Sequence, residues 1–97
     1  MRVRFFANLR TITGCAEAEV PYEETAGALA RSLCNIYGEK LKEKMFPFGN
    51  AEASDGAEIG AEIIVLINGR HISHLGGVAA PLKPDDRVDV FPVVAGG

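Results

Sequence analysis

The fold is decided by the stretch Arg87-Val88-Asp89-Val90-Phe91-Pro92-Val93-Val94-Ala95-Gly96-Gly97. Polar and apolar residues alternate up to Phe91, which predicts a half-buried strand. Pro92 then ends the backbone ladder because it has no N–H group. The five residues after Pro92 carry no charged side chain, and two glycines without a Cβ let this tail enter a narrow channel. At roughly 3.3 Å per residue the tail reaches about 17 Å. The alternative is a frayed terminus, the usual state of chain ends.

The composition describes one small domain. A chain of 97 residues with 24% charged side chains is ordinary for a single globular core. The net charge of -3 argues against nucleic-acid binding, which depends on neutralising phosphates, and no apolar run is long enough to span a bilayer. Residues 1–6 alternate, which predicts a strand and not a signal peptide. Cys15 and Cys34 have no metal-like spacing, so we expect a reduced, cytoplasmic protein.

The N-terminal residues predict a hairpin. Residues 2–7 and 16–20 both alternate, and a loop over residues 9–14 separates them. The inward faces are apolar: Val3, Phe5 and Ala7 on the first strand, and Ala16, Ala18 and Val20 on the second. The outer faces carry opposite charges, which favours one register of the two strands: Arg2 and Arg4 against Glu17 and Glu19.

A helix follows the hairpin. Thr25 is suited to cap the N-terminus of this helix, and Gly38 is suited to the position just after its last residue. Between them an apolar stripe recurs at helical spacing and is expected to cover one face of the sheet: Ala26, Leu29, Leu33 and Ile36. Cys34 borders this stripe as a small buried hydrophobe. We expect a short second helix over residues 39–46, and a tolerated surface insertion over residues 47–60.

The continuous apolar run Ile63-Ile64-Val65-Leu66-Ile67 predicts a central strand covered on both sides. Four leucines and isoleucines are therefore expected in the core: Leu29, Leu33, Ile64 and Leu66. Asn68-Gly69 is a strong hairpin signal, and residues 70–75 should return as an edge strand. His71 and His74 would point to opposite faces of that strand without an acidic or cysteine partner nearby, so we predict no metal site.

The order of these elements predicts an α+β domain: a mixed sheet, packed on one side by one main helix, with the last strand in the middle. We find no Ser/His/Asp or Cys/His set, no paired carboxylates and no phosphate-binding loop, so we predict no catalytic residues. A terminal carboxylate becomes reactive once a partner activates it, for instance by adenylation with ATP. Phe6 and Phe91 fall on polar positions and suggest a docking patch, unless the loop over residues 47–60 covers them.

Several motifs together resemble the MoaD/ThiS family of ubiquitin-like sulfur carriers, which includes the small subunit of molybdopterin synthase and the small archaeal modifier proteins. The resemblance covers nearly the whole chain apart from residues 38–60. The residues that carry it are Val3-Arg4-Phe5-Phe6-Ala7-Asn8-Leu9-Arg10, Thr13-Gly14, Thr25, Ile67-Asn68-Gly69-Arg70, Pro81-Leu82-Lys83 and Phe91-Pro92-Val93-Val94-Ala95-Gly96-Gly97.

The resemblance implies a β-grasp, ubiquitin-like domain over residues 1–92 and a flexible tail over residues 93–97. It implies that an E1-like, MoeB-type adenylyltransferase uses ATP to adenylate Gly97, which then becomes a thiocarboxylate. The chain would donate sulfur as the non-catalytic small subunit of molybdopterin synthase, with no tightly bound cofactor. Its tail would enter a MoaE-like large subunit through Pro92, Val93, Val94, Ala95 and Gly96. Val93 stands where many relatives have a second proline.

Other functions stay open. Relatives with the same fold and tail form isopeptide bonds between the terminal glycine and lysines of target proteins. Others carry sulfur for thiamine or cysteine biosynthesis, although the thiamine carriers are usually shorter. The remaining alternative is an interaction domain whose tail has no role. Sulfur delivery and protein modification begin with the same activated carboxylate, so the sequence does not separate them.

Overall fold

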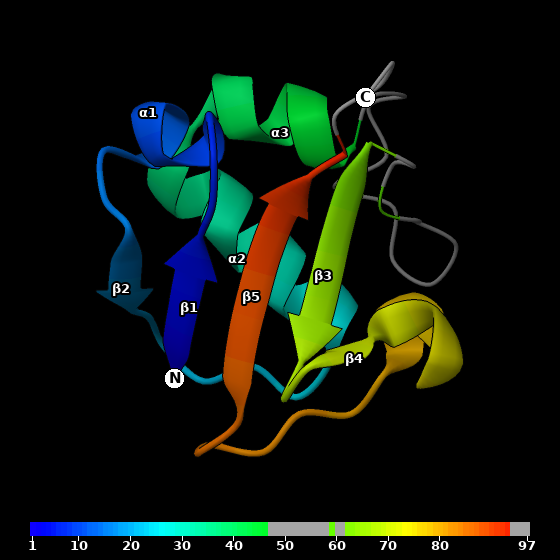
Figure 1. The fold of residues 1–97 in the computed structure, drawn as a ribbon. Helices are drawn as coiled ribbons and strands as arrows, with labels where there is room; N and C mark the ends of the chain where they lie inside the picture. Colours follow the sequence, from blue (N-terminus) through cyan, green and yellow to red (C-terminus); the bar gives the residue numbers. More distant parts are fainter. Residues whose placement is uncertain (47–58, 60–61, 94–97) are drawn as a thin grey trace.

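The computed structural model describes residues 1–46, 59 and 62–93 (Figure 1). Most of the predicted loop over residues 47–60, and the tail residues Val94, Ala95, Gly96 and Gly97, lie outside the described residues. No helix in the described part of the chain is long and apolar enough to cross a membrane. The elements in chain order are β1 (Arg2–Phe5), α1 (Leu9–Thr13), β2 (Glu17–Glu19), α2 (Ala26–Tyr37), α3 (Glu39–Met45), β3 (Ile63–Ile67), β4 (Arg70–His71), the 3₁₀ turns η1 (Ile72–His74) and η2 (Gly77–Ala79), and β5 (Arg87–Pro92).

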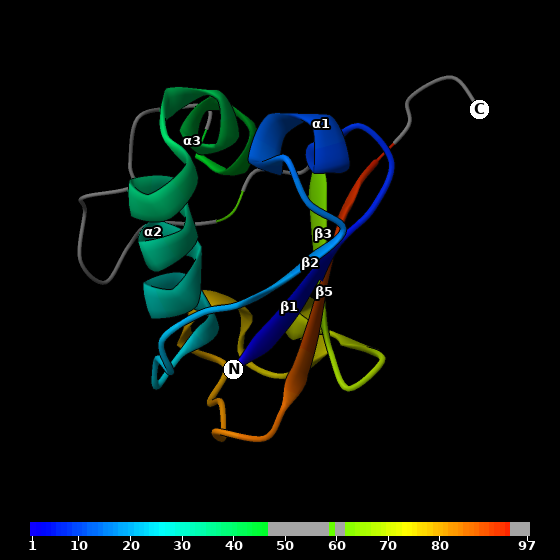
Figure 2. The same cartoon turned by 90° about the vertical axis from the view of Figure 1, so that its left-hand side faces the viewer.

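The sheet is mixed, and its last strand lies in the middle, as predicted. The strand order is β2-β1-β5-β3-β4, with β5 parallel to β1 and antiparallel to β3. In the side view α2 and α3 lie on one side of the sheet (Figure 2). No helix of the described residues covers the other side, which we call the open face. The architecture therefore has two layers, with the core between α2 and the sheet.

Helix α2 begins and ends where the sequence predicts. The hydroxyl of Thr25 accepts a hydrogen bond from the amide of Ala28 at 3.2 Å, and Gly38 caps the other end with a φ of 91°. The buried stripe contains Leu29 and Leu33, but the prediction for Ile36 is wrong, because its side chain is 49% exposed. The stripe continues through Tyr37, whose ring packs edge-on against Phe5 at 5.5 Å.

Strand β3 has one covered face and not two. Ile63, Val65 and Ile67 are buried toward the helices, while Ile64 and Leu66 are half-buried on the open face. The prediction that Ile64 and Leu66 belong to the core is therefore wrong. A continuous apolar run does not reveal which alternate residues face the helix, and an apolar open face produces the same pattern.

The first hairpin places the basic outer face beside the acidic one, as predicted, with Arg2 opposite Glu19 and Arg4 opposite Glu17. The segment between its strands is helix α1, and not the loop expected from the sequence. Ala7 is exposed and has a φ of 53°, so the prediction that it faces the core is wrong. The strand ends at Phe5, and the chain turns at Ala7 to start α1, whose Leu9 is buried instead.

The second hairpin turns at Asn68 and Gly69, whose φ angles of 51° and 85° are those of a type I′ turn. Strand β4 ends at His71, and the prediction that it continues to Leu75 is wrong. The imidazole Nδ1 of His71 accepts a hydrogen bond from the amide of Ser73 at 3.0 Å, which caps η1 and turns the chain away from the sheet.

Candidate functional site

Strand β5 holds the start of the predicted tail firmly. Its residues pair with β1 on one side and β3 on the other, and Val88 and Val90 are fully buried. Pro92 is the last residue of the strand, one residue past the predicted alternation. The prediction that Pro92 ends the backbone ladder is wrong, because Pro92 lies opposite Ile63 and the amide of Val93 still donates a hydrogen bond to the carbonyl of Glu62 at 2.7 Å. Val93 itself is 43% exposed. The described part of the chain is therefore fixed up to the residue from which the tail leaves.

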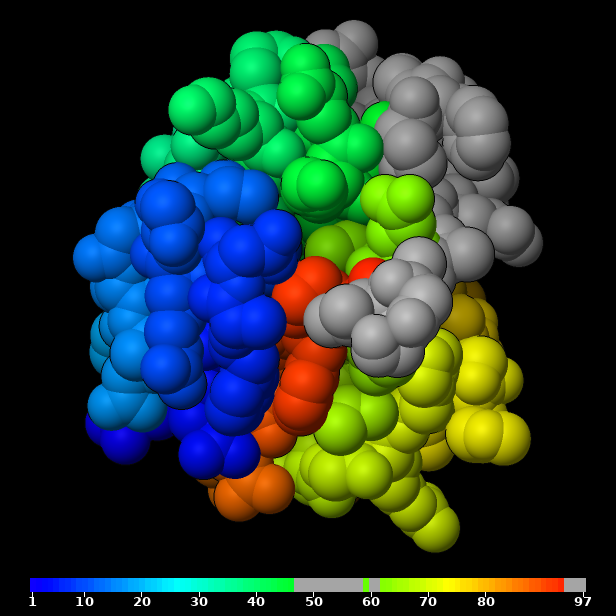
Figure 3. Space-filling model, turned by 45° about the horizontal axis from the view of Figure 1, so that its top comes forward, coloured from blue at the N-terminus to red at the C-terminus, as the bar shows by residue number. Residues whose placement is uncertain are grey.

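The open face carries an apolar patch next to this exit. The rings of Phe6 and Phe91 stack with centroids 4.4 Å apart and an interplanar angle of 11°. Ile64 lies opposite Phe91 in the β3–β5 register, and Leu66 lies two residues along β3. We call these four half-buried side chains the open-face patch: Phe6, Ile64, Leu66 and Phe91. In the space-filling view the end of β5 reaches the surface between β1 and β3 (Figure 3).

An ion pair lies beside the open-face patch. Arg4 donates from Nε and Nη2 to the two carboxylate oxygens of Asp89, at 2.7 and 3.0 Å. This hydrogen bonding raises the pKa of the Arg4 guanidinium above its ordinary value. Asp89 is only 5% exposed, and Arg87 Nε lies 3.8 Å from its carboxylate. This pair was not predicted from the sequence, although Arg4 and Asp89 both occupy polar positions of strands that are neighbours in the sheet.

A second arginine reaches the same aromatic ring from α1. Arg10 donates from Nε to the carbonyl of Phe5 at 3.0 Å, and its Cζ lies 5.7 Å from the centroid of the Phe6 ring. Arg4 Cζ lies 5.4 Å from the same centroid. Both distances are within the range of cation–π contacts. Arg10 was not predicted as a site residue because residues 9–14 were expected to form a loop, whereas Arg10 lies in α1.

Neither cysteine has an arrangement that activates a thiol. Burial raises the pKa of Cys34 to about 11, so this thiol stays protonated near neutral pH, as expected of a small buried hydrophobe. Cys15 is half-buried, with its Sγ 3.7 Å from the hydroxyl of Tyr37. Burial, followed by the contact with Cys15, raises the pKa of Tyr37 to about 12.

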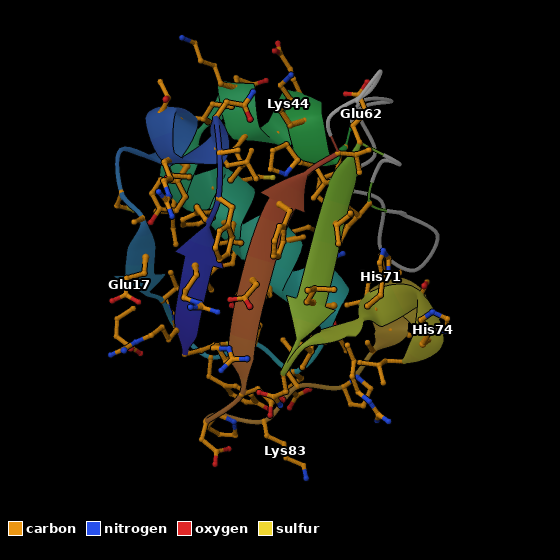
Figure 4. All side chains as sticks on the ribbon, viewed as in Figure 1. Glu17, Lys44, Glu62, His71, His74 and Lys83 are labelled. Carbon is orange, nitrogen blue, oxygen red and sulfur yellow. The ribbon has the colours of Figure 1, made fainter. Side chains whose placement is uncertain are left out.

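The two histidines lie together, contrary to the expectation that they point to opposite faces. Their rings are nearly perpendicular with centroids 6.4 Å apart, because η1 replaces the predicted strand. Both lie at the β4 edge, whereas Glu17 lies at the opposite edge (Figure 4). Among the described residues, no three His, Cys, Asp or Glu side chains are placed to hold a metal ion.

Comparison with known proteins gives consistent matches over the full length. The model of the ThiS family matches residues 3–97. Small archaeal modifier protein 3 of Haloferax volcanii is 35% identical over 99 residues, which cover 100% of this chain and 98% of the relative. The solution structure of small archaeal modifier protein 1 from Methanosarcina acetivorans has a TM-score of 0.83 at 35% identity, covering 99% and 94% of the two chains.

A third relative carries a different name. A putative molybdopterin converting factor, subunit 1, from Pyrococcus furiosus has a TM-score of 0.67 at 28% identity, covering 96% of this chain and 95% of the relative. The fold is the ubiquitin-like β-grasp that the resemblance implied, with a central β5 and a main helix across one face. On the match over residues 3–97 and the full-length relatives, this chain belongs to the ThiS family of ubiquitin-like sulfur carriers and modifiers.

Proposed function

We propose that this protein is a ubiquitin-like modifier, joined through the carboxylate of Gly97 to lysine side chains of target proteins. The observation that carries the proposal is the 35% identity to small archaeal modifier protein 3, which extends over 100% of this chain and 98% of that relative. The similarity to small archaeal modifier protein 1 at the same identity supports the same function.

The chemistry needs an activating partner. An E1-like, MoeB-type adenylyltransferase transfers AMP from ATP to the Gly97 carboxylate and releases pyrophosphate. The amine of a target lysine then attacks the acyl carbon, AMP leaves, and an isopeptide bond forms. ATP and Mg²⁺ are bound by the partner, which supplies the positive charge that stabilises the phosphates. This chain would contribute the carboxylate itself, at the end of a tail that begins at Val93, where a hydrogen bond to Glu62 fixes the backbone.

The open-face patch is the proposed docking surface for that partner, and it extends the predicted pair Phe6 and Phe91 by two aliphatic side chains. Pro92 to Gly96 would then occupy the channel that leads to the active site. Phe91→Ala should weaken binding of the activating enzyme about tenfold or more, as expected for an aromatic anchor. Phe91 is half-buried and stacks on Phe6, so the substitution also lowers the unfolding free energy. Thermal unfolding therefore has to show that the variant is folded at the temperature of the binding assay. An unchanged dissociation constant would exclude the patch as the docking surface.

The modifier function is tested by isolating the tagged protein from cells under denaturing conditions. Trypsin cleaves after Arg87, the last basic residue, so each modified lysine should carry the branch of residues 88–97. Mass spectrometry should find this branch on target peptides from the native chain and not from a chain lacking Gly96 and Gly97. If no lysine carries the branch while the purified chain is still adenylated, the modifier function is wrong and activation is retained.

The similarity to the putative molybdopterin converting factor subunit favours a second candidate, which is sulfur delivery. The same acyl-adenylate would react with a sulfur nucleophile, lose AMP and leave a thiocarboxylate on Gly97. A MoaE-like large subunit would then take up the tail and pass the sulfur to its substrate. Incubation with the activating enzyme, ATP and a sulfur donor should raise the intact mass by one oxygen-to-sulfur exchange. Sulfur on Cys15 or Cys34 instead would contradict this route.

A further inference from the structure

The Phe6 ring is shared by two arginines with different electrostatic surroundings. The guanidinium of Arg4 forms two hydrogen bonds with the carboxylate of Asp89, so its charge is neutralised within the molecule. Arg10 uses Nε to hold the carbonyl of Phe5, and no carboxylate of the described residues lies within 4 Å of its guanidinium. Arg10 is exposed, and its guanidinium lies beside the ring with Nε as the one donor atom that bonds to the described residues.

The other arginines of the open face resemble Arg4 in having acidic partners. Arg2 lies 3.6 Å from Glu19, and Arg87 lies 3.8 Å from Asp89. Arg10 is therefore the uncompensated cation next to the open-face patch in the described part of the chain. It also lies close to the tail exit, since it contacts Phe6, Phe6 stacks on Phe91, and Phe91 precedes Pro92 and Val93.

We infer that Arg10 selects partners that present a carboxylate beside an apolar side chain. This inference rests on the proposed function, because the partner considered is the E1-like activating enzyme. The apolar side chain would lie on the open-face patch, and an Asp or Glu would accept both terminal N–H groups of Arg10. A planar guanidinium matches a carboxylate with two parallel hydrogen bonds. The bond from Nε to Phe5 already holds the guanidinium in place, which reduces the entropy lost on binding.

The chain as a whole carries a net charge of -3, which would repel an acidic partner surface in the absence of a local cation. Beside the open-face patch, a partner carboxylate therefore gains more at Arg10 than at Arg4, whose guanidinium is already paired with Asp89. Arg10 would thus determine the orientation of the docked partner as well as its identity, because the patch alone is apolar and non-directional.

The test measures binding of the full-length chain to the E1-like adenylyltransferase of the same genome, without ATP. Arg10→Met keeps the alkyl stem over Phe6 and removes the charge; it should weaken binding about tenfold, with a smaller dependence on salt. Arg10→Lys keeps the charge but lacks the planar guanidinium that can form two parallel hydrogen bonds, so its loss of affinity should be intermediate. Arg70→Ala is the matched control: this exposed arginine on β4 lies at the opposite end of the sheet from α1, and its removal should leave binding unchanged (Figure 1).

Thermal unfolding of each variant shows whether the loss of the bond to Phe5 affects folding, and Arg10→Lys provides a second folded variant if Arg10→Met is destabilised. Equal binding by the native, Arg10→Met and Arg10→Lys chains would overturn the inference, as would an equal loss in Arg70→Ala. Adenylation of the native chain at saturating enzyme is measured in parallel. If adenylation occurs but Arg10 has no effect on binding, the inference alone is wrong. If Gly97 is never adenylated, the proposed function is wrong and the inference fails with it.

Discussion

Insertion of one alanine between Val93 and Val94 tests whether adenylation depends on the distance between the docked domain and the carboxylate of Gly97. The hydrogen bond between Val93 and Glu62 fixes the chain at Val93, which leaves four residues to Gly97. At about 3.3 Å per residue these four reach about 13 Å, and the insertion moves the carboxylate by about 3.3 Å relative to the open-face patch. A misplacement near 1 Å already costs on the order of a hundredfold in rate, so adenylation should fall at least that far.

The assay is the rate of adenylation at saturating activating enzyme, followed by pyrophosphate release. Val94→Ala is the control, because it changes the tail chemistry without changing its length, and it should stay within about threefold of the native rate. The insertion lies beyond the last described hydrogen bond of β5, so the unfolding free energy should change by less than about 0.5 kcal/mol. An insertion variant that is adenylated at the native rate would refute the reasoning, since the partner would then bind the tail without reference to the domain.

Three further predictions concern the folded domain. Leu33→Ala should lower the unfolding free energy by about 2–5 kcal/mol because Leu33 is 1% exposed, whereas Leu66→Ala on the open face should cost clearly less; equal losses in urea titrations would contradict the two-layer core. Gly27→Ala should cost about 1–3 kcal/mol because the added Cβ would lie 3.0 Å from both the Cβ and the carbonyl oxygen of Val78, and an unchanged melting temperature would show that η2 moves freely. Because burial raises the pKa of Cys34 from 9.0 to about 11, the folded state favours the neutral thiol, so this contribution to stability is present below pH 9 and is lost as the pH rises through about 11. Between pH 9 and about pH 11, the unfolding free energy of Cys34→Ala should fall less than that of the native chain. If urea titrations show the same fall for both chains, Cys34 is not the group that causes it.

The elements with strong local signals were predictable from the sequence. The N-cap at Thr25, the hairpin turn at Asn68-Gly69 and the strand that ends at Pro92 each depend on the chemistry of one or two residues. The central position of β5 also followed from the order of elements. Features that depend on contacts between distant residues were less accessible, and the faces of β3 are the clearest example: Ile64 and Leu66 look like core residues in any local window.

In the candidate site, too, features with a local sequence signal were predictable and features that depend on distant contacts were not. The aromatic pair Phe6 and Phe91 was found because both residues break an alternating pattern, and the structure brings their rings together. The ion pair of Arg4 with Asp89 joins residues 85 positions apart, so it becomes visible only once β1 and β5 are known to be neighbours. Arg10 required the knowledge that residues 9–13 form a helix, which starts after the unusual positive φ of Ala7.

The central position of β5 has a mechanical consequence. A molecular motor that pulls on a protein joined to Gly97 would transmit its force into this domain along the axis of β5. The hydrogen bonds of β5 to β1 and to β3 run across that axis, so both ladders would be loaded in shear along the strand and would not open one bond at a time. An edge strand such as β2 would have a ladder on one side only. A load on the chain end would thus have to break two ladders, and not one, before β5 left the sheet.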